Sequence, residues 1–249
     1  MSNVVIIGGH GKIALRLAGL LAKSSFNVTS VIRNASQAGD ITAQSAKPHV
    51  LSLEAAPVSE LTKLFTDTRA QLVYFAAGAG GKGGPDRTKA VDYDGAVKVF
   101  DAVEAVPGSE KPRVILVSAI DCRNPDKLDQ YPAHYNDEDK ERSRKAHEAI
   151  GTYYKWKFEA DKNLVGRSAF KWTILRPSGL TDGPGTGLVE IGRTHIGMTV
   201  SRDDVAQTLF ELAYRPDAHG LALDLINGKT PIKDALDVAI KKGETDYTD

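Results

Sequence analysis

Residues 4–14 read VVIIGGHGKIA, and the rest of the chain is organised around this stretch. Its first four residues are apolar, which is typical of a strand buried on both faces, as in a parallel sheet covered by helices. Gly8, Gly9 and Gly11 then allow the backbone to turn sharply and to approach a ligand closely. A helical pattern begins at Lys12, so the first amide groups of a helix point into the turn, where a pyrophosphate can bind. The stretch predicts a strand, a tight turn and a helix; a glycine turn without a ligand is the alternative.

The spacing of the small residues fits two versions of the dinucleotide-binding pattern. Gly9, Gly11 and Ala14 satisfy G-x-G-x-x-A, while Gly8, Gly11 and Ala14 satisfy the wider G-x-x-G-x-x-A. Such a pattern gains meaning when it follows a strand and opens a helix, as it does here.

The composition is that of an ordinary globular protein. With 249 residues, 41% of them hydrophobic and 26% charged, the chain can form one large α/β domain. Its 32 basic and 32 acidic residues cancel, so no overall positive field attracts nucleic acid or an anionic membrane. The single cysteine, Cys122, fits a reducing cytosol, and the six histidines are scattered. We expect a cytoplasmic protein that has no metal site and binds neither nucleic acid nor membrane.

Strand-like and helix-like runs alternate along the rest of the chain. Strands are expected at residues 27–32, 49–53, 71–77, 114–119, 171–176 and 221–226, and helices at 13–24, 58–65, 91–100, 201–212 and 232–240. This alternation predicts a Rossmann-like, doubly wound α/β fold, with a mostly parallel sheet and helices on both faces. We expect one domain over residues 1–249, with a polar surface insertion near 121–148 and a small substrate-side part after 177.

The end of the second expected strand bears on the choice of cofactor. About 20 positions beyond the glycines, an acidic residue would bind the two ribose hydroxyls of NAD. Arg33 and Asn34 stand there instead, and a guanidinium suits a ribose phosphate because its planar fork donates paired, charge-assisted hydrogen bonds. The sequence therefore favours NADP over NAD; a solvated surface arginine is the alternative.

A second glycine-rich loop follows the expected strand at 71–77. Residues 78–85 read GAGGKGGP, so the strand ends in small residues that leave space at its carboxyl end. Open α/β sheets bind their ligands at that end, which places this loop beside the first glycine turn. For the outer glycines, a flexible lid or a plain turn remains an equal alternative.

Three residues suggest proton-transfer chemistry. Ser118 ends a central strand, and Tyr153 and Lys157 are four residues apart, on one face of an expected helix. An ammonium next to a phenol favours the phenolate, which makes the phenol a better acid or base near neutral pH. Ser118 could hold a substrate oxygen against that phenol. The alternative is an ordinary aromatic–lysine pair.

In chain order, the motifs VVIIGGHGKIA, VIRN, VYFAAGAGG, VDYDGA, VILVSA, YYKWK, TILRPSGL and SRDDVA resemble the atypical short-chain dehydrogenase/reductases, in particular their NmrA-like and flavin-reductase-like members. The resemblance implies that residues 8–13 hold the pyrophosphate, that Arg33 meets the 2′-phosphate, and that Ser118, Tyr153 and Lys157 form the catalytic set. Lys157 would also touch the nicotinamide ribose. Ser52 stands where relatives often have an aspartate for the adenine. The residues expected to bind the cofactor are Gly8, Gly9, His10, Gly11, Lys12, Ile13, Arg33, Asn34, Leu53, Ala77, Gly78, Ser118, Lys157, Pro177 and Gly179.

These observations together predict an NADP(H)-dependent oxidoreductase that acts on a small carbonyl or related substrate. Tyr153 would donate or take the proton while the nicotinamide exchanges a hydride with the substrate carbon. A non-catalytic NADP(H) sensor that signals to a protein partner is the competing interpretation. Epimerase or dehydratase chemistry on a nucleotide sugar is less favoured, because no second lobe is evident after Pro177.

Overall fold

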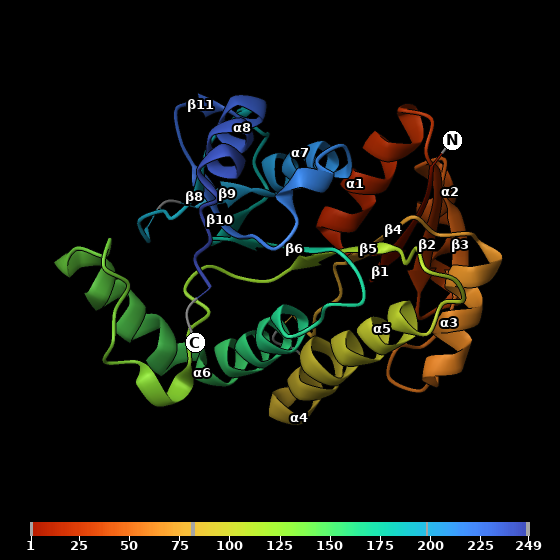
Figure 1. Cartoon of the computed structure of the whole chain (residues 1–249), viewed down its shortest axis with the longest axis horizontal. Helices are drawn as coiled ribbons and strands as arrows, with labels where there is room; N and C mark the ends of the chain where they lie inside the picture. Colours follow the sequence, from red (N-terminus) through yellow and green to blue (C-terminus); the bar gives the residue numbers. More distant parts are fainter. Residues whose placement is uncertain (1, 81–82, 198, 248–249) are drawn as a thin grey trace.

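A nine-stranded sheet runs through the molecule, in the order β11-β8-β10-β6-β5-β4-β1-β2-β3 (Figure 1). The structure is a computed structural model, and it describes residues 2–80, 83–197 and 199–247. The strands are β1 (Asn3–Ile7), β2 (Asn27–Ile32), β3 (Lys47–Val50), β4 (Leu72–Phe75), β5 (Arg113–Val117), β6 (Trp172–Pro177), β7 (Leu180–Thr181), β8 (Leu188–Gly192), β9 (Val200–Ser201), β10 (Ala222–Asn227) and β11 (Thr230–Pro231). β7 and β9 form a separate two-stranded sheet.

Six consecutive pairings, from β3 to β10, are parallel, and only β8 and β11 run antiparallel to their neighbours. The strand order reverses between β1 and β4, where a ligand crevice is expected in a doubly wound sheet. The predicted Rossmann-like fold is confirmed.

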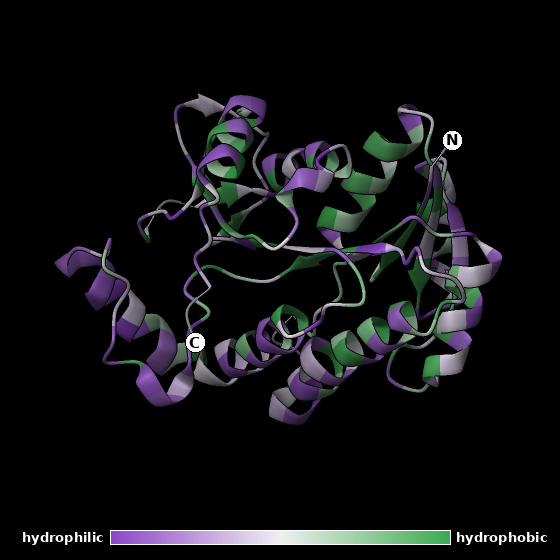
Figure 2. Ribbon diagram, in the orientation of Figure 1, coloured by the Kyte–Doolittle hydropathy of each residue, from purple (hydrophilic) through white to green (hydrophobic). Residues whose placement is uncertain are grey.

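Helices cover both faces of the sheet. They are α1 (Lys12–Lys23), α2 (Ala38–Ala43), α3 (Val58–Asp67), α4 (Gly84–Thr88), α5 (Gly95–Glu104), α6 (Asp137–Val165), α7 (Arg202–Ala213) and α8 (Ile232–Lys242), with a π-helical turn at Lys89–Asp94. α1, α7 and α8 pack on one face, and α3, α5 and α6 on the other (Figure 1). Apolar side chains fill the space between these helices and the sheet. In Figure 2 the ribbon of α1 and of the strands beside it has mostly the hydrophobic colour.

α6 is a helix of two parts. Its backbone leaves helical geometry at Ile150, where φ is −135° and ψ is 34°. A capping box of Asn136 and Asp139 begins the first part, and the second part packs its buried residues against the sheet. The end of the polar insertion and the helix expected to carry Tyr153 and Lys157 therefore belong to one helix, divided by a kink.

Two expectations about local structure were wrong. The part after Pro177, where no strand was expected before residue 221, contains β7, β8 and β9, and β8 pairs with β10. The insertion at 121–148, expected to bury little, contributes buried Asp121, Arg123 and Ser143 to a network of ion pairs and hydrogen bonds. Hydropathy patterns do not reveal charges that are buried in pairs.

Among the described residues, no helix is long and apolar enough to cross a membrane. Within the same ranges, no cluster of three or more histidine, cysteine or acidic side chains has the arrangement of a metal site.

Candidate functional site

The turn between β1 and α1 is packed so closely that it requires glycine. Gly8 has φ of +81°, and a Cβ placed on it would lie 2.6 Å from the Cα of Ala77 at the end of β4. A Cβ on Gly9 would lie 2.6 Å from the Cβ of Ser30 on β2. The turn therefore fits between the ends of two neighbouring strands, at the point where the strand order reverses.

The start of α1 is suited to an anion. Its N-cap is Gly11, which has no side chain to cap the helix, and the first turn contains no acidic residue. The free amide groups and the helix dipole therefore attract negative charge at this end. Lys12, at the first position, pairs with Asp182 at 2.6 Å.

A cavity of about 250 Å³ lies beside this turn, at the carboxyl ends of β1, β2 and β4. Seven of the expected cofactor residues line it: Gly8, His10, Gly11, Arg33, Leu53, Ala77 and Gly78. The other eight expected residues are outside its lining: Gly9, Lys12, Ile13, Asn34, Ser118, Lys157, Pro177 and Gly179.

The polar groups around the cavity differ in whether they have partners. Arg33 is exposed at the cavity rim and has no ion-pair or hydrogen-bond partner in the part of the chain that the structure describes. The ring of His10, in contrast, lies between Asp40, at 2.7 Å from Nε2, and Gln37, at 3.1 Å from Nδ1. Arg33 is therefore a cation available to a ligand, whereas His10 is held in place by its neighbours.

Asn34, Pro177 and Gly179 have structural contacts of their own. The side chain of Asn34 accepts a hydrogen bond from the amide of Ser36 and caps a short 3₁₀ turn. Pro177 ends β6, and the carbonyl of Gly179 accepts a hydrogen bond from Val200. The structure accounts for these three residues without a ligand, and their assignment to the cofactor stays a prediction.

Tyr153 and Lys157 lie on the second part of α6, near the end of β5. Lys157 Nζ is 5.8 Å from the centre of the Tyr153 ring. The same ammonium is buried, pairs with Asp92 at 3.1 Å, and donates to the carbonyl oxygen of Val117 at 3.2 Å. Val117 immediately precedes Ser118, so the structure brings the three expected catalytic residues to one region.

The predicted effect of Lys157 on the phenol is only partly right. Burial raises the pKa of Tyr153 to about 12, and the nearby ammonium, which acts in the opposite direction, does not compensate. Asp92 neutralises much of the positive charge, because its carboxylate is the partner of Lys157. Tyr153 is therefore a protonated phenol near neutral pH, and its raised pKa makes it a weaker proton donor than an exposed tyrosine.

The Ser118 side chain faces the interior. It is buried, and its hydroxyl lies 3.8 Å from the Sγ of Cys122 and close to the carboxyl group of Asp161. Burial raises the pKa of the Cys122 thiol to about 12, so this cysteine is not a nucleophile.

Asp92 was not predicted as a site residue, although it lies in the quoted motif VDYDGA. Its carboxylate accepts a hydrogen bond from the amide of Ala79 at 2.9 Å and pairs with Lys157, and it is almost completely buried. Asp92 thus connects the second glycine-rich loop, next to the cavity, with Lys157. Residues 81 and 82 of that loop lie outside the described residues. The sequence did contain a signal for Asp92. Its carboxylate stands at a position of the expected helix where an apolar side chain would be buried.

Residues 8–216, more than half of the chain, match the family described as NAD(P)H-binding. The chain belongs to this NAD(P)H-binding family. The match covers the glycine turn, the cavity and the region of Tyr153 and Lys157, and the predicted resemblance is confirmed at the level of this family.

Relatives extend over nearly the whole chain. The UPF0659 protein C216.03 of Schizosaccharomyces pombe is 42% identical over 249 residues, which cover 100% of this chain and 99% of the relative. The "uncharacterized sugar epimerase YhfK" of Bacillus subtilis is 33% identical over 235 residues, covering 94% and 98%. Among solved structures, a Bacillus halodurans protein assigned as an NAD-dependent epimerase/dehydratase has a TM-score of 0.76 and 27% identity, covering 95% of this chain and 100% of that one.

Proposed function

We propose that this NAD(P)H-binding protein is an NADP(H)-dependent oxidoreductase of the atypical short-chain dehydrogenase type. The observation that carries the proposal is Arg33, a guanidinium at the rim of the cavity, at the end of β2, that has no partner among the described residues. The adenosine ribose of a dinucleotide lies at this position in the fold, and a guanidinium there favours a 2′-phosphate over a free hydroxyl.

The residues present fit such a dinucleotide. The glycine turn allows the pyrophosphate to approach the backbone, and the uncapped start of α1 favours its negative charge. When bound, the nicotinamide supplies or accepts a hydride at C4. Tyr153 holds a proton that it can give to a substrate oxygen, and Lys157 holds Asp92 and thereby the loop at Ala79.

The cofactor part of the proposal is tested by thermal unfolding with NADPH, NADP, NADH or NAD. A ligand that binds only the folded state stabilises it by about 2.7 kcal/mol at roughly 100 times its dissociation constant. We expect the two phosphorylated dinucleotides to raise the melting temperature more than the other two, and Arg33→Ala to remove this difference.

Lys171→Ala, an exposed lysine outside the cavity lining, is the matched control and should retain the preference. Equal stabilisation by all four dinucleotides in the wild-type protein would contradict the assignment of Arg33. No stabilisation by any of them would contradict the cofactor site itself.

The chemical part is tested by the oxidation of NADPH with a panel of small carbonyl compounds. We expect Tyr153→Phe to keep the thermal stabilisation by NADPH but to lose turnover by about 100-fold or more, because general acid catalysis contributes on that scale. Turnover that survives the substitution would remove Tyr153 from the catalytic set. A wild-type protein that binds NADPH but reduces none of the panel would favour the sensor interpretation.

A further inference from the structure

The last described residues of the chain, Glu244–Tyr247, form an ordered segment that we call the C-terminal strap. It leaves α8 at Gly243, whose φ is +63°, and runs to the side of the sheet where α6 packs (Figure 1). The ring of Tyr247 stacks on Phe158 of α6, with 6.3 Å between the ring centres. The strap therefore connects the two layers of helices.

The strap completes the edge of β10 beyond the end of β8. The pairing of β8 with β10 ends at Gly192 and Asp224. Two positions earlier on β10, the carbonyl of Ala222 accepts a hydrogen bond from the amide of Asp246 at 2.9 Å, and the amide of Ala222 donates to the hydroxyl of Thr245 at 3.2 Å. Backbone groups that would otherwise form an open edge are thereby satisfied.

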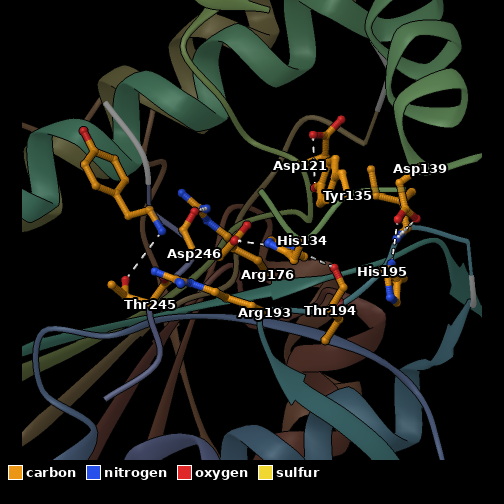
Figure 3. A network of polar contacts seen from close by, with 12 residues as sticks. Asp121, His134, Tyr135, Asp139, Arg176, Arg193, Thr194, His195, Thr245 and Asp246 are labelled. Atoms are coloured by element: carbon orange, nitrogen blue, oxygen red, sulfur yellow. Dashed lines mark hydrogen bonds and ion pairs between the residues drawn. The ribbon is translucent and has the colours of Figure 1, made fainter. Parts of the chain in front are cut away.

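Two arginines hold the backbone of the strap. Arg176 on β6 donates to the carbonyl of Asp246 at 2.9 Å, and Arg193, just after β8, donates to the carbonyl of Thr245 at 3.0 Å. Figure 3 shows both arginines beside the strap. The Arg176 guanidinium also pairs with Asp161 on α6 at 2.8 Å, and both side chains are completely buried. The strap thus contacts the same arginine that fixes Asp161, one helical turn beyond Lys157.

Two buried carboxyl groups interact where the strap meets β10, one from β10 and one from the strap itself. Asp224 on β10 is completely buried, and in the described part of the chain neither of its oxygens has a hydrogen-bond donor. Its neighbour is the buried side chain of Asp246. Two carboxylates cannot share such a site without a proton between them, because their charges repel in a medium of low polarity.

The other charged and titratable groups around the pair do not supply a donor for Asp224. Arg176 lies opposite Asp224 in the strand register, and its charge partly lowers the pKa of that carboxyl group, but it donates no hydrogen bond to either oxygen. Its guanidinium is engaged with Asp161 and with the backbone of Asp246, and Arg193 is exposed and bound to the carbonyl of Thr245. The remaining groups are His134, whose Nε2 is 3.8 Å from Asp246, and Asp121 with Tyr135 (Figure 3). Tyr135 and Arg123 both donate hydrogen bonds to Asp121. Burial and the neighbouring carboxyl group raise the pKa of Asp224 well above its ordinary value, and burial also raises the pKa of Asp246.

We propose that the C-terminal strap is a proton-dependent clasp: a proton shared by Asp224 and Asp246 keeps it docked over Arg176 and α6, and loss of that proton releases it. The direction follows from linkage. When the strap is released, both carboxyl groups contact water and return to ordinary pKa values, so the docked state binds more protons than the released state. Docking is therefore strongest at low pH and weakens as the pH rises through the raised pKa of the pair.

The experiment measures amide hydrogen exchange in residues 245–247 of the full chain between about pH 5 and pH 9, relative to an unstructured peptide of the same sequence. Once the pair loses its proton, protection of the strap should fall by up to about tenfold per pH unit in the wild-type protein. In Asp224→Asn, a neutral amide donates to Asp246 at every pH, so protection should no longer depend on pH.

Asp237→Asn, an exposed aspartate of α8, is the matched control and should keep the wild-type pH dependence. The proposal is overturned if wild-type protection does not change with pH, or if Asp224→Asn and the wild-type protein lose it in parallel. Should Asp224→Asn fail to fold, Asp246→Asn is tested instead. The amide of Ala222, which donates to Thr245 of the strap, then reports by its hydrogen exchange whether docking depends on pH. None of these outcomes depends on whether the protein binds a dinucleotide or turns over a substrate.

Discussion

Asp92 is the residue on which the geometry of the candidate site depends most. One of its oxygens fixes the amide of Ala79 beside the cavity, and the other pairs with the buried ammonium of Lys157. The pair raises the pKa of Lys157 above its ordinary value. Its contribution to stability is therefore fully present below the ordinary lysine pKa of about 10.4, and is lost only as the pH rises through the raised value.

We expect Asp92→Asn to lower the free energy of unfolding by about 3 kcal/mol near neutral pH. The amide oxygen can still accept from Ala79, so the substitution removes the charge and leaves Lys157 buried without a partner, which is costly. Urea unfolding of the wild-type and variant proteins measures the difference.

Asp94→Asn is the matched control, two residues further along. Asp94 pairs with Lys89 at 2.9 Å, but both side chains are more than 40% exposed. A pair of this kind contributes less than about 1 kcal/mol. Similar losses for the two variants would show that the Asp92–Lys157 pair has no special place in the stability of the site.

At the level of single residues, the sequence predicted positions better than environments. The four-residue spacing of Tyr153 and Lys157 predicts that they lie side by side on one helix face, and Lys157 Nζ is 5.8 Å from the centre of the Tyr153 ring. The sequence could not show that Asp92 neutralises Lys157, since the two are 65 positions apart and come together only through the sheet. The pKa of Tyr153 was therefore expected to fall, whereas burial raises it to about 12.

At the scale of elements, the parts with strong local signals were predictable. The strand, turn and helix from Asn3 to Lys23 follow from an apolar run, three glycines and a helical period in direct succession. Ser201 caps α7 by accepting a hydrogen bond from the amide of Asp204, as its SRDDVA motif suggests. In both cases the residues that determine the structure are neighbours in the sequence.

β8 and the C-terminal strap were not predictable in this way. β8 is a short strand with alternating exposure, Leu188 exposed and Val189 buried, in a segment rich in glycine. Its partner, β10, lies more than 30 positions later, and the strap reaches the same strand from beyond α8. Pairings of this kind depend on tertiary contacts, which outweigh weak local preferences.

Across the whole molecule, the two faces of the sheet are stabilised differently. The face under α1, α7 and α8 is packed by an apolar cluster that includes Leu17, Leu209 and Leu236. The face under α6 also contains apolar residues, but it holds the buried ion pairs Lys157–Asp92, Arg176–Asp161 and Arg123–Asp121. The first part of α6, residues 137–149, is mostly polar, as its colour in Figure 2 shows.

That first part of α6 depends on weak interactions. Its ion pairs, such as Arg144 with Glu141 and Glu148, are on the surface, where each contributes about 0.3–0.5 kcal/mol. Its main attachments are Asp139, which accepts hydrogen bonds from His195 and Ile196, and Ser143, which accepts one from Arg123. The kink at Ile150 allows this part to open while the second part stays packed.

We therefore expect native-state hydrogen exchange to separate the two regions. Amides in residues 140–149 should exchange by local opening, about 100-fold faster than those of α1, and their rates should not respond to low concentrations of urea. Leu209→Ala, in the apolar cluster on the opposite face, should lower the global stability by about 2–5 kcal/mol and accelerate exchange in α1. Exchange in the first part of α6 should stay at its wild-type rate in this variant, because its opening does not require that cluster to separate. If residues 140–149 instead accelerate together with α1, the kink does not divide the helix and the molecule opens as one unit.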